Sequence, residues 1–253
     1  MERVTSRNNP LAAHFKKLRG SRSYRRETGC FFCEGPKMLS EALRWEAALL
    51  TVVAVEGVSL PPLPGAVRQV TVPQSLLQAL ADTETPQGVL FVCSMPSLVP
   101  PLKLGGGRYL VLDGVQDPGN VGTILRTADA FGADGVFLVN GCADPFSPKT
   151  VRSTMGAIFR LPVWETDAAS LRDLLREAGI PLFAATLSPE ASDVRSADLS
   201  RAAVVIGSEG SGVSKEVLGL VDRSIMIPMT SRCESLNAAA AAAVTLWEMF
   251  RAT

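Results

Sequence analysis

Residues Leu110–Val139 read LVLDGVQDPGNVGTILRTADAFGADGVFLV, a pattern of strand, loop, helix and strand. An apolar run of strand composition leads into a loop rich in Asp, Gly and Pro, and apolar residues at helical spacing follow. Asn120 stands where a helix N-cap is expected, Gly132 where the C-cap is expected, and Val136–Val139 predicts the next strand. The stretch therefore predicts a β-α-β unit. In open α/β sheets, ligands bind at the carboxyl ends of such strands.

The charge of the chain is unevenly distributed. The 253 residues carry a formal net charge of zero, and 47% of them are hydrophobic, which is enough for one large domain or two smaller ones. Residues 1–26 contain eight Lys or Arg residues and a single acid, Glu2. A basic segment of this kind is typical of a protein that binds a polyanion, although a solvated, partly disordered tail would have the same composition.

The cysteines and the apolar runs indicate where the protein works. Five cysteines are scattered along the chain, and no signal peptide is recognised, so we expect a reducing, cytoplasmic location. Cys30 and Cys33 have CxxC spacing, but no second pair completes a metal site, and we expect no metal. No apolar run reaches membrane-spanning length, so we expect no membrane partner.

The predicted elements divide the chain into two α/β halves. Residues 1–95 alternate between short strands and helices, and the last of these strands covers 88–93. Residues 96–107 are rich in proline and glycine and predict a linker. Alternation resumes over residues 108–253, where we expect helices at 149–159 and 171–177, strands at 182–185, 203–206 and 224–228, and a C-terminal helix.

Several common chemistries are excluded by the motifs. Gly105–Gly107 precedes a strand, whereas a dinucleotide-binding glycine loop follows one. The chain has no GxxxxGK[ST] phosphate loop, and its single histidine, His14, lies in the basic segment. The sequence therefore does not favour zinc catalysis or a Ser-His-Asp triad.

Three polar segments follow predicted strands. They are DPGNVGTILR (117–126), IGSEGSG (206–212) and IPMTSRCESLN (227–237). A single sheet could bring all three together at one edge. Their glycines would let main-chain N–H and C=O groups approach a ligand closely, which suits an adenine or a sulfonium cofactor.

These three segments resemble the signature motifs of the SpoU, or TrmH-like, branch of the SPOUT RNA methyltransferases. NVGTILRTADAFG is similar to the first motif, IGSEGSGVS to the second and IPMTSRCESLNAAAAAAV to the third. The first half also resembles an L30e-like RNA-binding domain, through FCEGPKMLSEA (32–42) and DTETPQGVLF (82–91). The resemblance implies an L30e-like substrate-binding domain at 1–95, a linker at 96–107 and a methyltransferase domain at 108–253. That second domain would have a parallel sheet and a C-terminal trefoil knot.

The resemblance also implies a cofactor and a set of site residues. S-adenosylmethionine would bind in the knot, and the cofactor-binding positions would be Gly207, Ile227, Leu236, Thr186 and Met229. The conserved polar positions of the family, implied to be catalytic, fall on Asn120, Arg126, Glu209, Ser235 and Asn237. The run Ala238–Ala243 departs from the more varied residues expected there, but alanine is the best helix former.

Arg126 has two possible roles in methylation of a ribose 2′-hydroxyl. The hydroxyl is a poor nucleophile until its proton is removed or hydrogen-bonded. Arg126 could act as a base with help from the substrate phosphate, but a guanidinium resists deprotonation. It could instead remain a cation that binds that phosphate and orients the ribose. Glu209 could hold Arg126 or the ribose, or simply stabilise a helix start.

We therefore expect an S-adenosylmethionine-dependent RNA 2′-O-ribose methyltransferase that acts as a homodimer, with ribosomal RNA favoured as substrate. A tRNA 2′-O-methyltransferase, a base methyltransferase and a non-catalytic RNA-binding or ribosome-assembly protein remain alternatives. A housekeeping role and antibiotic self-resistance are both compatible with the sequence. RNA contacts are expected from the basic cluster Lys16, Lys17, Arg19, Arg22, Arg25 and Arg26.

Overall fold

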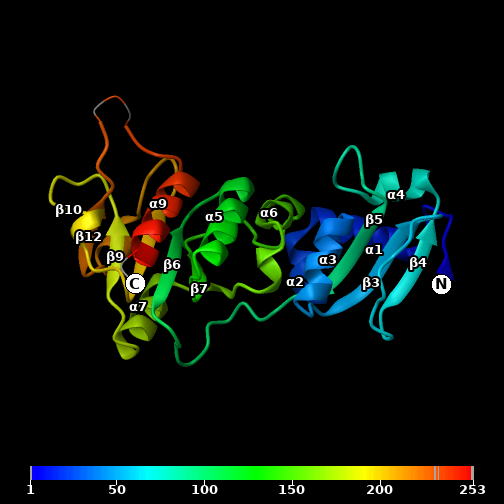
Figure 1. Ribbon diagram of the computed structural model, residues 1–253, viewed down its shortest axis with the longest axis horizontal. Helices are drawn as coiled ribbons and strands as arrows, with labels where there is room; N and C mark the ends of the chain where they lie inside the picture. Colours follow the sequence, from blue (N-terminus) through cyan, green and yellow to red (C-terminus); the bar gives the residue numbers. More distant parts are fainter. Residues whose placement is uncertain (1, 231, 233, 252–253) are drawn as a thin grey trace. The chain divides into compact units, whose positions relative to one another are not determined.

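A computed structural model of the chain describes residues 2–230, 232 and 234–251 and divides it into two compact α/β units (Figure 1). Unit 1 comprises the residues up to Pro96 together with Phe146–Phe159. Unit 2 comprises Ser97–Pro145 and the residues from Arg160 onward. The expected mixed α/β class is confirmed. The segment Phe146–Phe159, expected within the second domain, belongs to the first unit.

Unit 1 is built on a five-stranded mixed sheet with the order β1-β4-β3-β5-β2. β5 runs antiparallel to both of its neighbours, whereas β3, β4 and β1 are parallel. The strands are β1 (Glu2–Arg3), β2 (Cys30–Glu34), β3 (Leu49–Val55), β4 (Arg68–Val72) and β5 (Val89–Ser94). Apolar residues from α1 (Pro10–Gly20) and α4 (Gln74–Leu80) pack in one cluster with residues from four of these strands and so cover one face of the sheet.

The basic N-terminal segment is folded rather than a solvated tail. Asn9 caps α1 by accepting a hydrogen bond from the Leu11 N–H, and Pro10 occupies the first turn. Leu11, Phe15 and Leu18 then recur at helical spacing and are buried against the sheet. A second helix, α2 (Arg22–Thr28), follows directly. The basic residues of this segment therefore stand at defined positions along two helices.

The other face of this sheet is covered partly by the segment from the second half of the chain. α3 (Pro36–Arg44) and α6 (Pro148–Thr154) both contact β2, and a 3₁₀ turn, η1 (Ala157–Phe159), follows α6. The ring of Phe146 lies 4.8 Å from that of Phe31, and the ring of Phe159 lies 6.2 Å from it. The predicted helix 149–159 is interrupted because Met155 takes a left-handed conformation, with φ of 51°.

Unit 2 is built on a seven-stranded sheet, parallel throughout, with the order β10-β12-β9-β11-β6-β7-β8. The strands are β6 (Arg108–Asp113), β7 (Gly135–Val139), β8 (Val163–Glu165), β9 (Leu182–Ala185), β10 (Ser192–Asp193), β11 (Ala202–Gly207) and β12 (Arg223–Met226). The expected parallel sheet is confirmed. The trefoil knot remains a prediction from the resemblance.

Helices cover both faces of this parallel sheet. α7 (Ala168–Glu177) and α8 (Lys215–Leu218) contribute to the apolar cluster that contains Tyr109 and Val111 of β6. Successive strand residues point to opposite faces, so Leu110 and Leu112 face the other side. α5 (Pro118–Ala130) and α9 (Ala238–Arg251) pack side by side in this unit (Figure 1), and α9 also contacts β11. Both faces of the strands are therefore buried, as their continuous apolar sequences indicate.

Phe146→Ala tests whether the inserted segment belongs to the core of unit 1. Phe146 is fully buried against Phe31, so its truncation should destabilise unit 1 by about 3–5 kcal/mol. Hydrogen exchange should accelerate at the amides of β2 and β5. The half-exposed Phe250 of α9 provides the control, because Phe250→Ala should leave those amides unchanged. Accelerated exchange confined to unit 2 would contradict this arrangement.

Candidate active site

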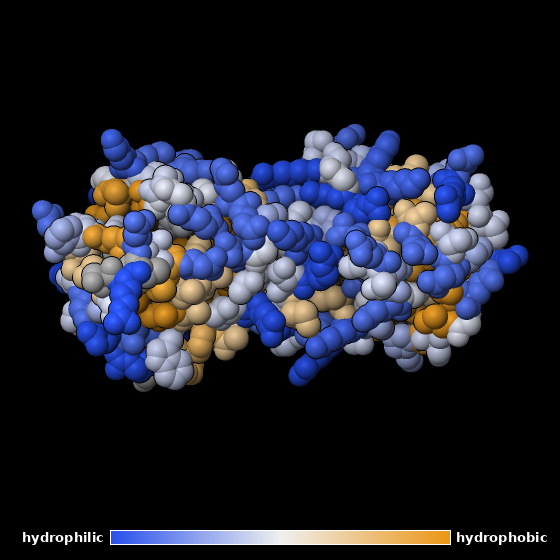
Figure 2. Space-filling view, turned by 90° about the horizontal axis from the view of Figure 1, so that it is seen from above, coloured by the Kyte–Doolittle hydropathy of each residue, from blue (hydrophilic) through white to orange (hydrophobic). Residues whose placement is uncertain are grey.

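Three loops meet at the carboxyl edge of the parallel sheet of unit 2. They leave the neighbouring strands β9, β11 and β12, which run in the same direction. Between them they enclose a cavity of about 830 Å³, within the range typical of small-molecule sites. Figure 2 shows hydrophobic side chains gathered at the end of this unit where Figure 1 labels β9, β10 and β12.

All five residues that the sequence assigned to cofactor binding line this cavity. Residues from the third motif and from the start of α9 also line it. The assigned residues are Gly207 from β11, Thr186 after β9, and Ile227, Met229 and Leu236 after β12. Residues 231 and 233 of this loop lie outside the described residues. The geometry therefore gathers three segments that are far apart in sequence around one cavity.

The loop after β11 reverses its direction within a few residues. Ser208 and Gly212 exchange two backbone hydrogen bonds, of 3.1 and 3.0 Å. The returning backbone passes so close to Gly207 that an added Cβ would lie 2.1 Å from the Gly212 carbonyl carbon and 2.2 Å from the Val213 nitrogen. Glycine is therefore required at position 207 by close approach of the chain to itself.

The charged residues of the cavity wall, as far as the structure describes it, are two carboxylates. Glu209 and Glu234 line the cavity, and no described Lys or Arg does so. Thr186 also lines it, and the buried Oγ1 of that residue has no hydrogen-bond partner among the described residues. Such a wall favours a cationic ligand with polar groups and disfavours the phosphates of a nucleotide.

A chain of hydrogen bonds joins the three sequence motifs beside the cavity. Asn120 donates from Nδ2 to Glu209 Oε1 at 2.5 Å, and Asn237 donates from Nδ2 to Asn120 Oδ1 at 3.1 Å. Asn237 Oδ1 in turn accepts from the Ala239 N–H at the start of α9. Three of the five predicted catalytic residues are thereby brought together.

The side chain of Asn120 can take part in these hydrogen bonds because it does not cap its own helix. The expectation that Asn120 is the N-cap is wrong: α5 begins at Pro118 and its cap is Asp117. Asp117 Oδ1 accepts a hydrogen bond from the Asn120 backbone N–H at 2.9 Å. The side chain of Asn120 is then available to reach Glu209 from the first turn of the helix.

The other two predicted catalytic residues are placed differently. Ser235 lines the cavity. Arg126 lies on the exposed side of α5, outside the cavity wall, and its side chain makes no hydrogen bond or ion pair with any residue in the described ranges. Arg126 follows Asn120 by six positions, which corresponds to roughly 120° around the helix. Arg126 and Glu209 are not paired.

Some cavity residues were not anticipated from the sequence. Leu187 and Ser188 follow Thr186 in the loop after β9, and Glu234 precedes Ser235. Leu218 and Ala241 also contribute, from α8 and α9. The position of Leu187 and Ser188 directly after a predicted strand was the available signal, because ligands bind at such strand ends.

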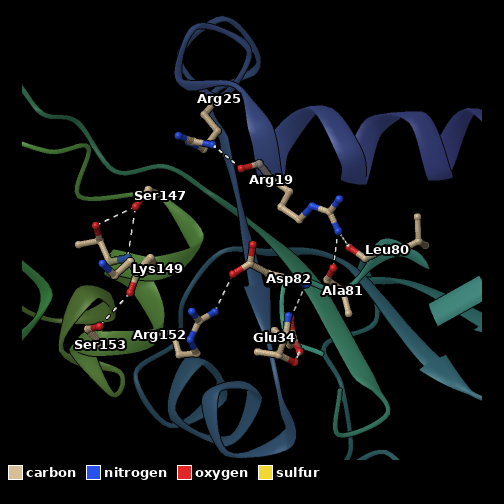
Figure 3. A network of polar contacts seen from close by, with 12 residues as sticks. Arg19, Arg25, Glu34, Leu80, Ala81, Asp82, Ser147, Lys149, Arg152 and Ser153 are labelled. Atoms are coloured by element: carbon tan, nitrogen blue, oxygen red, sulfur yellow. Dashed lines mark hydrogen bonds and ion pairs between the residues drawn. The ribbon is translucent and has the colours of Figure 1, made fainter. Parts of the chain in front are cut away.

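The basic cluster of unit 1 contains two arginines with structural contacts, as Figure 3 shows. Arg25 is buried, and its Nη1 donates to the Leu18 carbonyl at 2.5 Å and to the Arg19 carbonyl at 3.3 Å. Arg19 donates to the Leu80 and Ala81 carbonyls at the end of α4. Both guanidinium groups satisfy carbonyls at helix C-termini.

The expectation that Arg25 contacts RNA is therefore corrected, because its buried side chain is committed to carbonyls of α1. Lys16, Lys17 and Arg22 are exposed on the same two helices, and Arg26 is half-buried. The surface-accessible part of the basic cluster consists of these residues, with Arg19 partly exposed beside α4.

The other titratable groups considered from the sequence do not line the cavity. His14 Nδ1 is 2.9 Å from the Tyr24 hydroxyl in unit 1, and burial lowers the pKa of His14. Burial raises the pKa of the Cys142 thiol to about 11. Within the described residues no cluster of three His, Cys, Asp or Glu side chains could hold a metal ion. None of the described helices has the length and apolar character needed to cross a membrane.

Known proteins resemble the chain along nearly its whole length. Residues 107–247 match the SpoU rRNA Methylase family, and residues 9–90 match an MRM3-like substrate binding domain. The chain is 33% identical over 251 residues to the 23S rRNA (guanosine(2553)-2′-O)-methyltransferase RlmP of Bacillus subtilis, covering 98% of this chain and 99% of that protein.

Two solved structures have the same fold. The AdoMet-bound rRNA methyltransferase from Sinorhizobium meliloti superposes with a TM-score of 0.88 at 31% identity, covering 99% of this chain and 97% of that one. The SpoU methyltransferase AviRb from Streptomyces viridochromogenes, in complex with AdoMet, gives a TM-score of 0.86 at 28% identity, covering 96% and 98%.

Gly207→Ala should disrupt the loop that forms one wall of the cavity. The new Cβ would meet backbone atoms of Gly212 and Val213, so the loop must move at a cost of about 3 kcal/mol. Gly210→Ala is the matched control, since nothing lies within 4 Å of a Cβ at Gly210 in the same loop. Urea unfolding of unit 2 measures both variants. Equal stability of the two would show that the loop does not need glycine at position 207.

Proposed function

Because the chain belongs to the SpoU rRNA methylase family, we propose that it methylates a ribose 2′-hydroxyl of ribosomal RNA with S-adenosylmethionine, in the cytoplasm. The observation that carries the proposal is the cavity lined by residues of the second and third motifs, in a chain 33% identical to a 23S rRNA 2′-O-methyltransferase. The match of residues 9–90 to a substrate binding domain supports the assignment of unit 1 to RNA binding.

The cavity fits S-adenosylmethionine in volume and in charge. Glu209 and Glu234 would face a ligand that carries a sulfonium, an ammonium and a carboxylate group and so has a net positive charge. Thr186 Oγ1, which has no hydrogen-bond partner among the described residues, would bond a polar group of that ligand. Gly207 and the backbone of the β11 loop would contact the ligand closely because no side chain intervenes at that position. When bound, the cofactor supplies an electrophilic methyl carbon next to a sulfonium.

The chain's own polar residues would position the ribose. Asn120, Glu209 and Asn237 hold one another in place, and Glu209 also lines the cavity, so this group can accept a hydrogen bond from a substrate hydroxyl. Arg126 is exposed to solvent, where its charge would bind a backbone phosphate of the RNA. Of its two possible roles, the phosphate-binding cation accords better with this exposed position.

We also propose that the protein acts as a homodimer. Val244, Trp247 and Phe250 of α9 are exposed, and the rings of Trp247 and Phe250 each lie 6.0 Å from that of Phe131. A contiguous apolar face on the terminal helix suits an isologous interface, in which the same surface of two copies meets.

Transfer of labelled methyl groups tests the proposed reaction. The protein should label ribosomal RNA from radioactive S-adenosylmethionine, and the label should survive alkaline hydrolysis within a dinucleotide, because a methylated 2′-oxygen cannot attack the adjacent phosphate. Label in a base would instead indicate a base methyltransferase, and transfer to tRNA alone would indicate a tRNA enzyme. No transfer to free or ribosome-bound RNA would favour a non-catalytic RNA-binding protein.

Arg126→Ala should strongly slow methyl transfer while preserving the fold. The side chain is exposed and outside the cavity, so stability and S-adenosylmethionine affinity should be unchanged. Loss of a phosphate-orienting cation should lower kcat by roughly a hundredfold or more. Arg126→Lys should not restore the rate if two-pronged phosphate contact is required. Arg223→Ala, an exposed arginine of β12, is the control; near-normal turnover of Arg126→Ala would refute the assignment.

The triple substitution Lys16→Gln, Lys17→Gln and Arg22→Gln should weaken RNA binding. Each exposed cation that contacts a phosphate adds roughly one unit to the slope of log Kd against log salt concentration, so removing three should lower that slope by up to about three. Cofactor affinity should stay unchanged, because these residues belong to unit 1. Arg25→Gln is the contrasting variant, since loss of its buried carbonyl contacts should destabilise unit 1. An unaltered salt slope for the triple variant would place the RNA elsewhere.

A further inference from the structure

A buried carboxylate lies at the carboxyl edge of the parallel sheet, at the end of β6. Asp113 is the last residue of β6 and is only 2% exposed. The strand register pairs it with Gly207 of β11 on one side and with Val139 of β7 on the other. Asp113 does not line the cavity itself. A carboxylate removed from water is costly unless its oxygens accept hydrogen bonds.

Each oxygen of this carboxylate accepts from a different loop. Oδ2 accepts from the Ser214 backbone N–H at 2.6 Å, and Oδ1 accepts from Asn140 Nδ2 at 2.8 Å. Asn140 Nδ2 also lies 3.2 Å from Ser214 Oγ. The three residues thus form a closed triangle between the ends of β6 and β7 and the start of α8.

The backbone around this triangle has an unusual conformation that the contacts maintain. Asn140 has φ of 54°, in the left-handed region, and is one of three described non-glycine residues with positive φ. Asparagine tolerates that region better than most residues, and its amide here is directed to the carboxylate. A strained residue held by a specific contact points to a role beyond packing.

Asp113 holds the far end of the loop that forms the cavity wall. The loop leaves β11 at Gly207, which is fixed by pairing with Asp113, and returns to Ser214, whose N–H is fixed by the Asp113 carboxylate. Residues 207–213 between these two anchors all line the cavity, and Glu209 near the tip bonds Asn120. One residue therefore anchors both ends of the wall.

We propose that Asp113, with Asn140, is a positioning residue that holds the Gly207–Ser214 loop in its ligand-binding conformation. The inference rests on the proposed function only in naming S-adenosylmethionine as the ligand. Asp113 acts through the Ser214 N–H and does not touch the ligand. Loss of the carboxylate should leave that N–H without its acceptor and release the returning half of the loop.

Asp113→Ala tests the anchor, and an exchange of the two side chains tests its chemistry. In the double variant Asp113→Asn/Asn140→Asp, the new amide oxygen accepts from Ser214 N–H, and the new amide NH₂ donates to the carboxylate now at position 140. Total charge and both hydrogen bonds are kept. Asp134→Ala is the matched control: its carboxylate also accepts two backbone N–H groups, from Gly107 and Arg108, but at the amino edge of the sheet.

Two measurements on the full chain separate positioning from stability. In ligand-free protein, Asp113→Ala should speed hydrogen exchange at residues 208–214 and leave the central amides of β6 and β11 protected. Calorimetry should show a roughly tenfold or greater rise in Kd for S-adenosylmethionine at unchanged stoichiometry, since an unfolded fraction would lower stoichiometry instead. The double variant Asp113→Asn/Asn140→Asp should have a Kd within about threefold of the wild-type value. Asp134→Ala should lower the melting temperature without changing Kd.

A folded Asp113→Ala protein with wild-type Kd and wild-type hydrogen exchange in the loop would overturn the proposal. The proposal would also be overturned if the double variant Asp113→Asn/Asn140→Asp bound S-adenosylmethionine no better than Asp113→Ala. If Asp113→Ala does not fold, Asn140→Gly decides. Glycine accepts the positive φ while removing the amide, so faster loop exchange with a raised Kd supports the proposal and unchanged values overturn it. Failure of wild-type protein to bind S-adenosylmethionine would refute the proposed function. Hydrogen exchange at residues 208–214 in ligand-free protein would still test whether Asp113 holds the loop.

Discussion

The cavity of unit 2 depends on a place where the chain passes within van der Waals contact of its own backbone. A side chain at Gly207 would collide with the backbone at Gly212 and Val213, so the reversal after β11 exists only because glycine stands there. That reversal lines one side of the cavity with backbone and small side chains and brings Glu209 within reach of Asn120. The polar group beside the cavity is therefore a consequence of a steric condition at a residue that carries no functional group.

Each unit is assembled from two segments that are not contiguous in sequence. Phe146 and Phe159 fill the core of unit 1 beside β2, although the chain before and after them belongs to unit 2. Arg152 of the same segment pairs with Asp82 at 2.7 Å. Removal of the first 95 residues would consequently expose aromatic core residues on what remained. Substitution of surface charges is the sounder way to separate RNA binding from catalysis in this protein.

The sequence predicted the order of strands and helices well, because apolar runs bounded by turn residues mark most of them. The rule that ligands bind after parallel strands singled out the loops after β11 and β12, whereas the individual cofactor-binding positions came from the family resemblance. The exact ends of helices were harder to predict, because neighbouring residues can cap or end a helix at similar energy. Asp117 and Asn120 are equally good helix caps, and only the fold selects the first. The left-handed Met155, which ends α6, has no sequence signal. Helix α1 was not predicted, although Leu11, Phe15 and Leu18 have helical spacing, because the segment was interpreted from its positive charge alone.

A net charge of zero conceals two opposite local fields. The first helices present Lys16, Lys17 and Arg22 to solvent, whereas the described charges on the cavity wall are those of Glu209 and Glu234. A basic surface attracts a polyribonucleotide, and an acidic cavity retains a cationic cofactor but disfavours the RNA phosphates. Were the cavity basic, phosphates would compete for it; were the helices acidic, the RNA would be repelled. The separation of the two signs within the chain thus allows one protein to hold two ligands of opposite charge.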